Sequence, residues 1–170
     1  MNQKEEVLAD LKILQDELKV KTGPVNMGAP QLVLIAQDDY HAEHVGRTED
    51  GLQFFVTPLF VPAFDDKPGN EFIAVFLFND DGDLVESKVD ELGPRLLLDL
   101  DKARALKQTR LDELGEKTFE DIVVKPFAVE HFGEMMGLLP CKYEGRWAVE
   151  LHPGNFMSFS APWDSGEYDT

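Results

Sequence analysis

Hydrophobic residues recur along residues 4–20 with the spacing of one face of an α-helix. The stripe consists of Val7, Leu11, Leu14 and Leu18. Its intervals of four, three and four residues match the turn of a helix, and Gly23-Pro24 ends the segment. We therefore expect an amphipathic helix within residues 1–23. Its stripe packs on the body of the protein or, alternatively, on a second copy in a homo-oligomer.

Residues 31–92 instead show the short apolar runs and turn signals of antiparallel strands. The runs cover residues 31–36, 40–47, 52–57, 71–78 and 84–89. Asp-Gly pairs lie between successive runs and predict two hairpins. The run at 71–78, EFIAVFLF, is apolar on both faces, which indicates a central strand covered on both sides. Prolines separate the hairpins from Pro58 onward, and we expect a loop there because proline is excluded from central strands.

The second half of the chain mixes the patterns of helices and strands. Residues 96–114 have the periodicity of a helix that ends at Gly115. We further expect a strand at 119–125, a short helix at 128–136 and closing strands at 147–151 and 156–160. The chain is then one α+β domain, residues 1–170. Its mainly antiparallel sheet of hairpins is accompanied by the N-terminal helix and one or two further helices.

Charge is the compositional feature that changes this picture most. The chain has 33 acidic and 16 basic residues, a net charge of −17, and residues 24–100 alone carry 15 acids and 4 bases. Proteins that bind nucleic acids or anionic membranes concentrate lysine and arginine instead, so we expect neither partner. The acid surplus either serves solubility or forms a field that attracts a basic protein.

Targeting and redox signals favour the cytoplasm. No apolar run reaches the roughly 18–20 residues of a membrane span, and the charged N-terminus is unlike a secretory signal. Cys141 is the only cysteine, so no intrachain disulfide is expected. We therefore expect a cytoplasmic protein in which Cys141 is a partly buried, unreactive thiol.

Acidic and aromatic residues in the loops and the tail are the candidates for binding a partner. They are Asp38, Asp39, Asp80, Asp81, Asp83, Trp163, Asp164 and Tyr168. Carboxylates steer basic partners toward a surface, and large aromatic side chains anchor interfaces. Structural alternatives exist for both groups. The aspartates around Gly82 also suit a tight turn. Trp163 could instead pack into the core, in which case the rest of the acidic tail, 161–170, would be partly disordered.

Four side chains are weaker candidates for catalysis or metal binding. They are His41, His44, His131 and Glu134. The last two share one face of the predicted helix at 128–136, where they form either an acid–base pair or an ordinary surface contact. The first two lie three apart on a predicted strand and so point to opposite faces. The sequence contains no familiar nucleotide-binding, nucleophile-elbow or His-Glu-x-x-His motif, and we expect no cofactor.

The sequence favours a binding protein over an enzyme. The first hypothesis is a small acidic cytosolic protein that binds a basic protein, for example by occluding a cationic toxin or nuclease. The alternative is a small enzyme or a ligand- or metal-binding protein that uses a His/Glu site.

Overall fold

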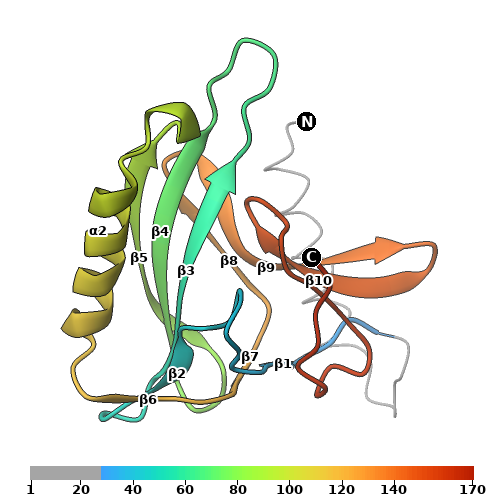
Figure 1. The fold of residues 1–170 in the computed structure, drawn as a ribbon. Coiled ribbons are helices and arrows are strands. Elements are labelled where there is room, and N and C mark those ends of the chain that lie inside the picture. The colour runs from blue at the N-terminus through green and yellow to red at the C-terminus, as the bar shows by residue number, and fades with distance from the viewer. Residues whose placement is uncertain (1–27) are drawn as a thin grey trace.

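The computed structural model describes residues 28–170, in which antiparallel β-strands are the main regular secondary structure (Figure 1). The strands form two layers, and one α-helix lies on the outer face of the larger sheet. The predicted helix within residues 1–23, together with its stripe Val7, Leu11, Leu14 and Leu18, lies outside the described residues.

The larger sheet has five strands in the order β5-β4-β3-β2-β6, and each neighbouring pair is antiparallel. The strands are β2 (Val45–Thr48), β3 (Gln53–Val61), β4 (Asn70–Phe78), β5 (Leu84–Gly93) and β6 (Lys117–Phe119). Both predicted hairpins are confirmed, except that the first arm begins at Val45 and not at residue 40, because residues 41–44 form a turn. Their turns place Gly51 and Gly82 at φ values of 86°, which glycine adopts without steric cost. β4 is buried on both faces, as its uniformly apolar sequence predicts.

The smaller sheet has four strands in the order β11-β10-β9-β8. The strands are β8 (Phe127–His131), β9 (Glu134–Tyr143), β10 (Arg146–His152) and β11 (Ser158–Ser160). A separate antiparallel pair joins β1 (Val33–Ile35) to β7 (Ile122–Val124). The predicted strands at 147–151 and 156–160 are confirmed as β10 and β11. The predicted strand at 119–125 divides into the end of β6 and all of β7.

The main core fills the space between the two sheets. Its buried side chains include Phe55, Phe72, Phe76 and Phe78 from the larger sheet and Phe127, Met136, Leu138, Val149 and Leu151 from the smaller one. Each such side chain contributes about 1.5–3 kcal/mol when fully buried. Because side chains alternate across a strand, Phe54, Val56 and Val75 point to the opposite face. There they form a second cluster with Leu111 of the helix.

The helix α2 (Leu100–Glu113) covers this opposite face of the larger sheet. The carboxylate of Asp99 caps it by accepting the N–H groups of Asp101 and Lys102 at 3.1 and 3.2 Å. A 3₁₀-helix, η1 (Arg95–Leu97), precedes α2, so the predicted helix at 96–114 is confirmed except for its first turn. No helix within residues 28–170 is long and apolar enough to cross a membrane.

The predicted α+β fold class is wrong, because the described residues are mostly antiparallel β-sheet with α2 as their single α-helix. The predicted helix at 128–136 is the main error, since this segment forms the β8–β9 hairpin. Phe132 and Gly133 take φ values of 55° and 76° in its turn. Two successive left-handed residues form a tight hairpin turn, whereas a right-handed helix ends at such a pair.

Pro58 lies within β3, so the loop predicted from Pro58 onward is also wrong at its start. Pro58 pairs with Ile73 of β4 on one side. On the other side β2 does not extend as far as Pro58. The last backbone hydrogen bond between β3 and this neighbouring segment runs from the N–H of Val56 to the carbonyl of His44, at 2.9 Å. Amides two residues apart point to the same side of a strand. Pro58, which has no N–H, therefore occupies an edge position of a strand that is central elsewhere.

Candidate functional site

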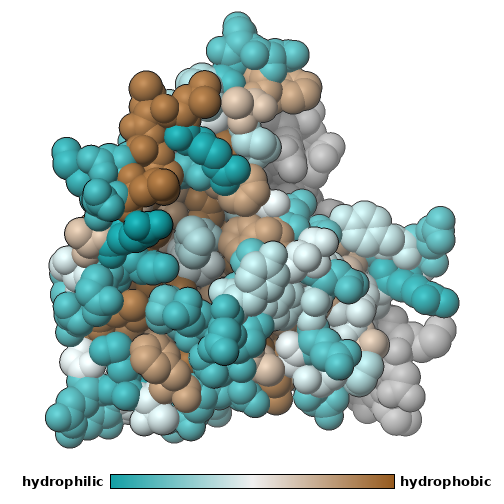
Figure 2. Space-filling view, viewed as in Figure 1, coloured by the Kyte–Doolittle hydropathy of each residue, from teal (hydrophilic) through white to brown (hydrophobic). Residues whose placement is uncertain are grey.

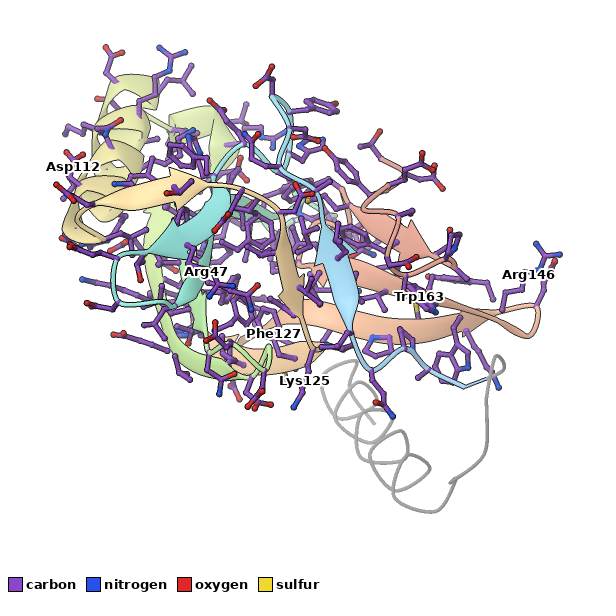
Figure 3. All side chains as sticks on the ribbon, turned by 90° about the horizontal axis from the view of Figure 1, so that it is seen from below. Arg47, Asp112, Lys125, Phe127, Arg146 and Trp163 are labelled. Carbon is purple, nitrogen blue, oxygen red and sulfur yellow. The ribbon has the colours of Figure 1, made fainter. Side chains whose placement is uncertain are left out.

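The C-terminal tail, residues 161–170, lies against β1 and β11. The N–H of Leu34 donates to the carbonyl of Trp163 at 2.9 Å, and Ser158 and Asp169 exchange backbone hydrogen bonds of 2.9 and 2.8 Å. Gly166 is buried so closely that a Cβ there would lie 2.6 Å from the Cβ of Ala36. Viewed from below, Trp163 lies beside β1, and Arg146 marks the distant tip of the β9–β10 hairpin (Figure 3).

Asp38 and Tyr168 form a latch that holds the tail to the loop after β1. The Tyr168 hydroxyl donates to Oδ2 of Asp38. Oδ1 of the same carboxylate accepts the N–H groups of Tyr40 and Ala42 at 2.8 and 2.9 Å. Burial pushes the pKa of Asp38 upward, but the Tyr168 hydroxyl and these two N–H groups outweigh it and lower the pKa below its usual range. Burial, and next the Asp38 carboxylate, raise the pKa of Tyr168 to about 12.

A cleft of about 600 Å³ opens where the tail meets residues 36–40 and β11. Three carboxylates line it, those of Asp38, Glu167 and Asp169, and the described residues of its lining include no lysine or arginine. Tyr40 also lines the cleft and is 66% exposed. The cleft therefore combines negative charge with an accessible aromatic ring, two features that recognise cationic side chains.

Two of the predicted partner-binding residues line this cleft, two more are neighbours of lining residues in the sequence, and a fifth packs against the core. Asp38 and Tyr168 line the cleft. Asp39 and Asp164 are exposed and adjacent in sequence to lining residues. Trp163 is half-buried and packs against the main core. The tail therefore contributes both a core contact and an acidic rim.

The other predicted partner-binding residues, the aspartates at 80–83, lie in the β4–β5 turn. Asp80 is paired with Arg47 of β2, and Asp83 accepts a hydrogen bond from Nζ of Lys125 at 2.7 Å. The hydrogen bond from Lys125 lowers the pKa of Asp83 below its usual range. Asp81 is exposed, and its N–H donates to Oδ1 of Asn79 at 3.0 Å. Two of the three carboxylates thus fasten the turn to neighbouring segments.

The four weaker candidates for catalysis contact different surroundings. The ring of His41 stacks on Tyr40 at 3.8 Å between centroids. The ring of His44 lies 5.8 Å from that of Phe119, and burial lowers the pKa of His44.

His131 Nε2 is 2.9 Å from the Ser87 hydroxyl. Glu134 faces His131 across the β8–β9 hairpin instead of one helical turn away. None of His41, His44, His131 and Glu134 lines the cleft. Among residues 28–170, no three histidine, cysteine, aspartate or glutamate side chains are grouped so that they could hold a metal ion.

A polar cluster on the β9–β10 hairpin was not predicted from the sequence. Glu150 Oε1 accepts hydrogen bonds from the Cys141 thiol at 3.3 Å and the Tyr143 hydroxyl at 3.0 Å, and it lies 3.7 Å from Nε2 of His152. These residues alternate along two paired strands and therefore share one face. The sequence signal was this alternation, but the mistaken helix at 128–136 hid the strand that carries Cys141.

Removing the Asp38 carboxylate should release the tail. We expect Asp38→Ala to lower the free energy of unfolding by about 2 kcal/mol, the usual cost of losing hydrogen bonds to a charged group. Asp39→Ala removes the neighbouring exposed carboxylate and should change stability by less than about 0.5 kcal/mol. Urea titrations followed by tryptophan fluorescence measure both changes.

The difference between these variants should also depend on pH. The pKa of Asp38 is lower in the folded protein than in the unfolded chain. Its stabilisation is therefore fully present above the usual aspartate pKa and is lost as the pH falls through the lowered value. An Asp38→Ala variant as stable as Asp39→Ala at neutral pH would contradict the latch.

Among the charged and aromatic residues that line the cleft, Tyr40, Glu167 and Asp169 were not among the predicted partner-binding residues. Asp38 and Tyr168 are 130 positions apart, and no spacing in the chain indicates that the tail returns to residues 36–40.

No protein-family model, curated protein or solved structure matches the chain.

Proposed function

We propose that this protein binds a basic segment of a partner protein in the acidic cleft between the tail and residues 36–40. The observation that carries the proposal is the composition of the lining, which has three carboxylates and no lysine or arginine among its described residues. Neutralisation of a cationic toxin or nuclease in the cytoplasm is a concrete form of this function. The mechanism is steric occlusion of the partner's basic surface.

The latch gives the cleft a fixed shape before the partner arrives. Asp38 is held by Tyr168 and by two backbone N–H groups, so its position is determined by the fold. A preformed site loses less conformational entropy on binding. Asp38 is therefore a positioning residue, and the exposed carboxylates beside it are the ones available to a partner.

Exposed charges supply the electrostatic attraction. Asp39, Asp164 and Glu167 are exposed at or beside the cleft, and the net charge of the chain is −17. Such a field raises the rate of encounter with a cationic partner, and salt screens it over a Debye length of about 10 Å at 0.1 M. Association should therefore slow as the ionic strength rises.

Neutralising the rim should weaken binding of a cationic probe. The triple variant Asp39→Asn/Asp164→Asn/Glu167→Gln should bind an octalysine peptide at least about tenfold more weakly than the wild type at low salt. The control Glu49→Gln/Asp50→Asn/Glu116→Gln removes the same number of exposed charges near the β2–β3 turn. Fluorescence anisotropy of the labelled peptide measures both affinities.

The control variant separates the cleft from the general charge of the protein. Equal weakening in both triple variants would show that octalysine responds to net charge alone and would overturn the assignment to the cleft. An affinity that does not change between low and physiological salt would contradict the electrostatic mechanism. Neither triple variant alters Asp38 or Tyr168, so the latch stays intact in both.

A further inference from the structure

Three leucines project into solvent at one end of the larger sheet. Leu96 is 96% exposed, Leu97 81% and Leu100 59%, and η1 buries none of its residues. We call these three residues the leucine ledge. Figure 2 shows hydrophobic residues gathered at the upper left of the molecule, over η1 and the start of α2. Contiguous exposed apolar side chains of this kind mark interaction surfaces.

The ledge is held in place from both sides. Before it, Nε of Arg95 donates to Oε1 of Glu71 at 2.9 Å, and the guanidinium lies 4.9 Å from the centre of the Phe60 ring. After it, Asp99 caps α2, and Arg110 fastens the helix to Asp90 of β5 through two hydrogen bonds of 2.7 and 2.8 Å. The leucines are therefore presented by an ordered backbone, which reduces the entropic cost of binding.

Further exposed aromatic rings lie at the same end of the sheets. Phe64, in the connection between β3 and β4, is 72% exposed. Phe132, in the β8–β9 turn, is 53% exposed and stacks on Phe72 at 5.9 Å between ring centroids. The strand register brings the β3–β4 connection and the end of β5 to the same end of the sheet, because Glu71 of β4 pairs with Phe60 of β3 and with Gly93 of β5. Exposed apolar side chains at this end of the larger sheet are therefore not confined to η1 and the start of α2.

Acidic residues surround this apolar surface. The segments that meet here are 60–72, 90–101 and 130–134, and together they contain nine aspartates and glutamates but only two basic residues, Lys67 and Arg95. Two of these carboxylates are already paired, that of Glu71 with Arg95 and that of Asp90 with Arg110 of α2. A second copy of the chain would bring the same excess of acids against this one, and like charges across an interface repel. The charge pattern instead fits a partner with apolar residues flanked by lysine or arginine.

We propose that the leucine ledge is a docking surface for an amphipathic, basic segment of another protein. The apolar face of the segment covers Leu96, Leu97 and Leu100, and its cationic flanks lie against the surrounding carboxylates. The inference does not depend on the acidic cleft, which is formed by other residues at the tail.

A designed amphipathic helix tests the ledge directly. The probe is a labelled 18-residue peptide with leucines on one face and lysines on the other, and its counterpart carries glutamate in place of lysine. Leu96→Ser/Leu97→Ser should weaken binding of the leucine–lysine peptide at least about tenfold. The control Val85→Ser/Val123→Ser changes two valines that are 51% and 37% exposed elsewhere and should change the affinity less than about twofold. Circular dichroism and urea unfolding verify that both variants fold.

Each other result would overturn the proposal. Unchanged affinity in the ledge variant would assign the peptide to another surface, and equal binding of the leucine–glutamate peptide would show apolar adhesion without charge recognition. A dimer in sedimentation that only the ledge variant loses would identify a second copy as the occupant. Binding to phosphatidylcholine vesicles that the ledge variant abolishes would identify a lipid surface. The cleft variant Asp39→Asn/Asp164→Asn/Glu167→Gln should bind the leucine–lysine peptide with an affinity close to that of the wild type, so the two proposals fail separately.

Discussion

Gly137→Ala should destabilise the protein by about 2–6 kcal/mol, the sum of about 1–3 kcal/mol of backbone strain and about 1–3 kcal/mol of overpacking. Gly137 lies in β9, paired with Ala128 of β8 on one side and His152 of β10 on the other. Its φ is 144°, and a Cβ would lie 2.2 Å from the carbonyl oxygen of Phe127. Because the clash is with backbone inside the sheet, no side-chain rotation relieves it.

Gly133→Ala is the matched control in the same hairpin. Gly133 also has a positive φ, 76°, but a Cβ there would meet no atom within 4 Å. The substitution therefore adds only left-handed strain, about 1–2 kcal/mol. Urea unfolding of both variants, monitored by tryptophan fluorescence, measures the difference. Equal destabilisation of the two variants would show that β8 does not approach β9 as closely as this pairing requires.

This hairpin also shows why part of the fold was hidden in the sequence. The earlier hairpins were predictable because Asp-Gly pairs lie between apolar runs. In the β8–β9 hairpin the turn is Phe132-Gly133, and Phe132 is a residue that rarely adopts a positive φ. The segment FAVEHFGEMM has helix-forming residues on both sides of the turn. Pairing of β9 with β10 overrides that propensity. Because the partner strand lies further along the chain, the local sequence gives no indication of this pairing.

The candidate site was predictable only in its residue types. Acidic residues and a terminal aromatic pair were visible as a possible partner surface. Asp38 and Tyr168 do come together in the cleft, whereas Trp163 packs against the main core. The tail reaches β1 through backbone bonds such as that of Leu34 to Trp163, which leave no signature in composition or spacing. The leucine ledge was hidden for a different reason. Its leucines fit the periodicity of the predicted helix at 96–114. That periodicity does not indicate whether another element packs against the leucines, so it could not predict their exposure.

The Cys141 cluster places a thiol, a carboxylate and an imidazole on one face of the β9–β10 hairpin, and its electrostatics disfavour the thiolate. Burial raises the pKa of the Cys141 thiol first, and the negative charge and hydrogen bond of Glu150 raise it further, to about 12. The neighbouring Tyr143 hydroxyl has its pKa raised as well, through its hydrogen bonds to Cys141 and Glu150. Burial lowers the pKa of His152 against the opposing effect of Glu150.

Iodoacetamide should therefore label Cys141 about a thousandfold more slowly in the native protein than in urea at pH 8. Only the thiolate reacts. At a pH below both values, the thiolate fraction falls about tenfold for each unit by which the pKa rises. The rise from 9.0 to about 12 therefore lowers it about a thousandfold. Cys141 is the only cysteine in the chain, so mass spectrometry of the intact protein measures this rate without interference.

The pH profile and one variant distinguish electrostatic suppression from simple lack of access. The native labelling rate should keep rising about tenfold per pH unit through pH 10, whereas a merely inaccessible thiol with an ordinary pKa would level off near pH 9. Glu150→Gln removes the negative charge and should speed labelling, but not to the unfolded rate, because burial is the larger cause of the shift. Native labelling at the unfolded rate would mean that a thiolate is available in the cluster that contains Glu150 and His152. A cysteine enzyme would then be a serious alternative to the binding function proposed above.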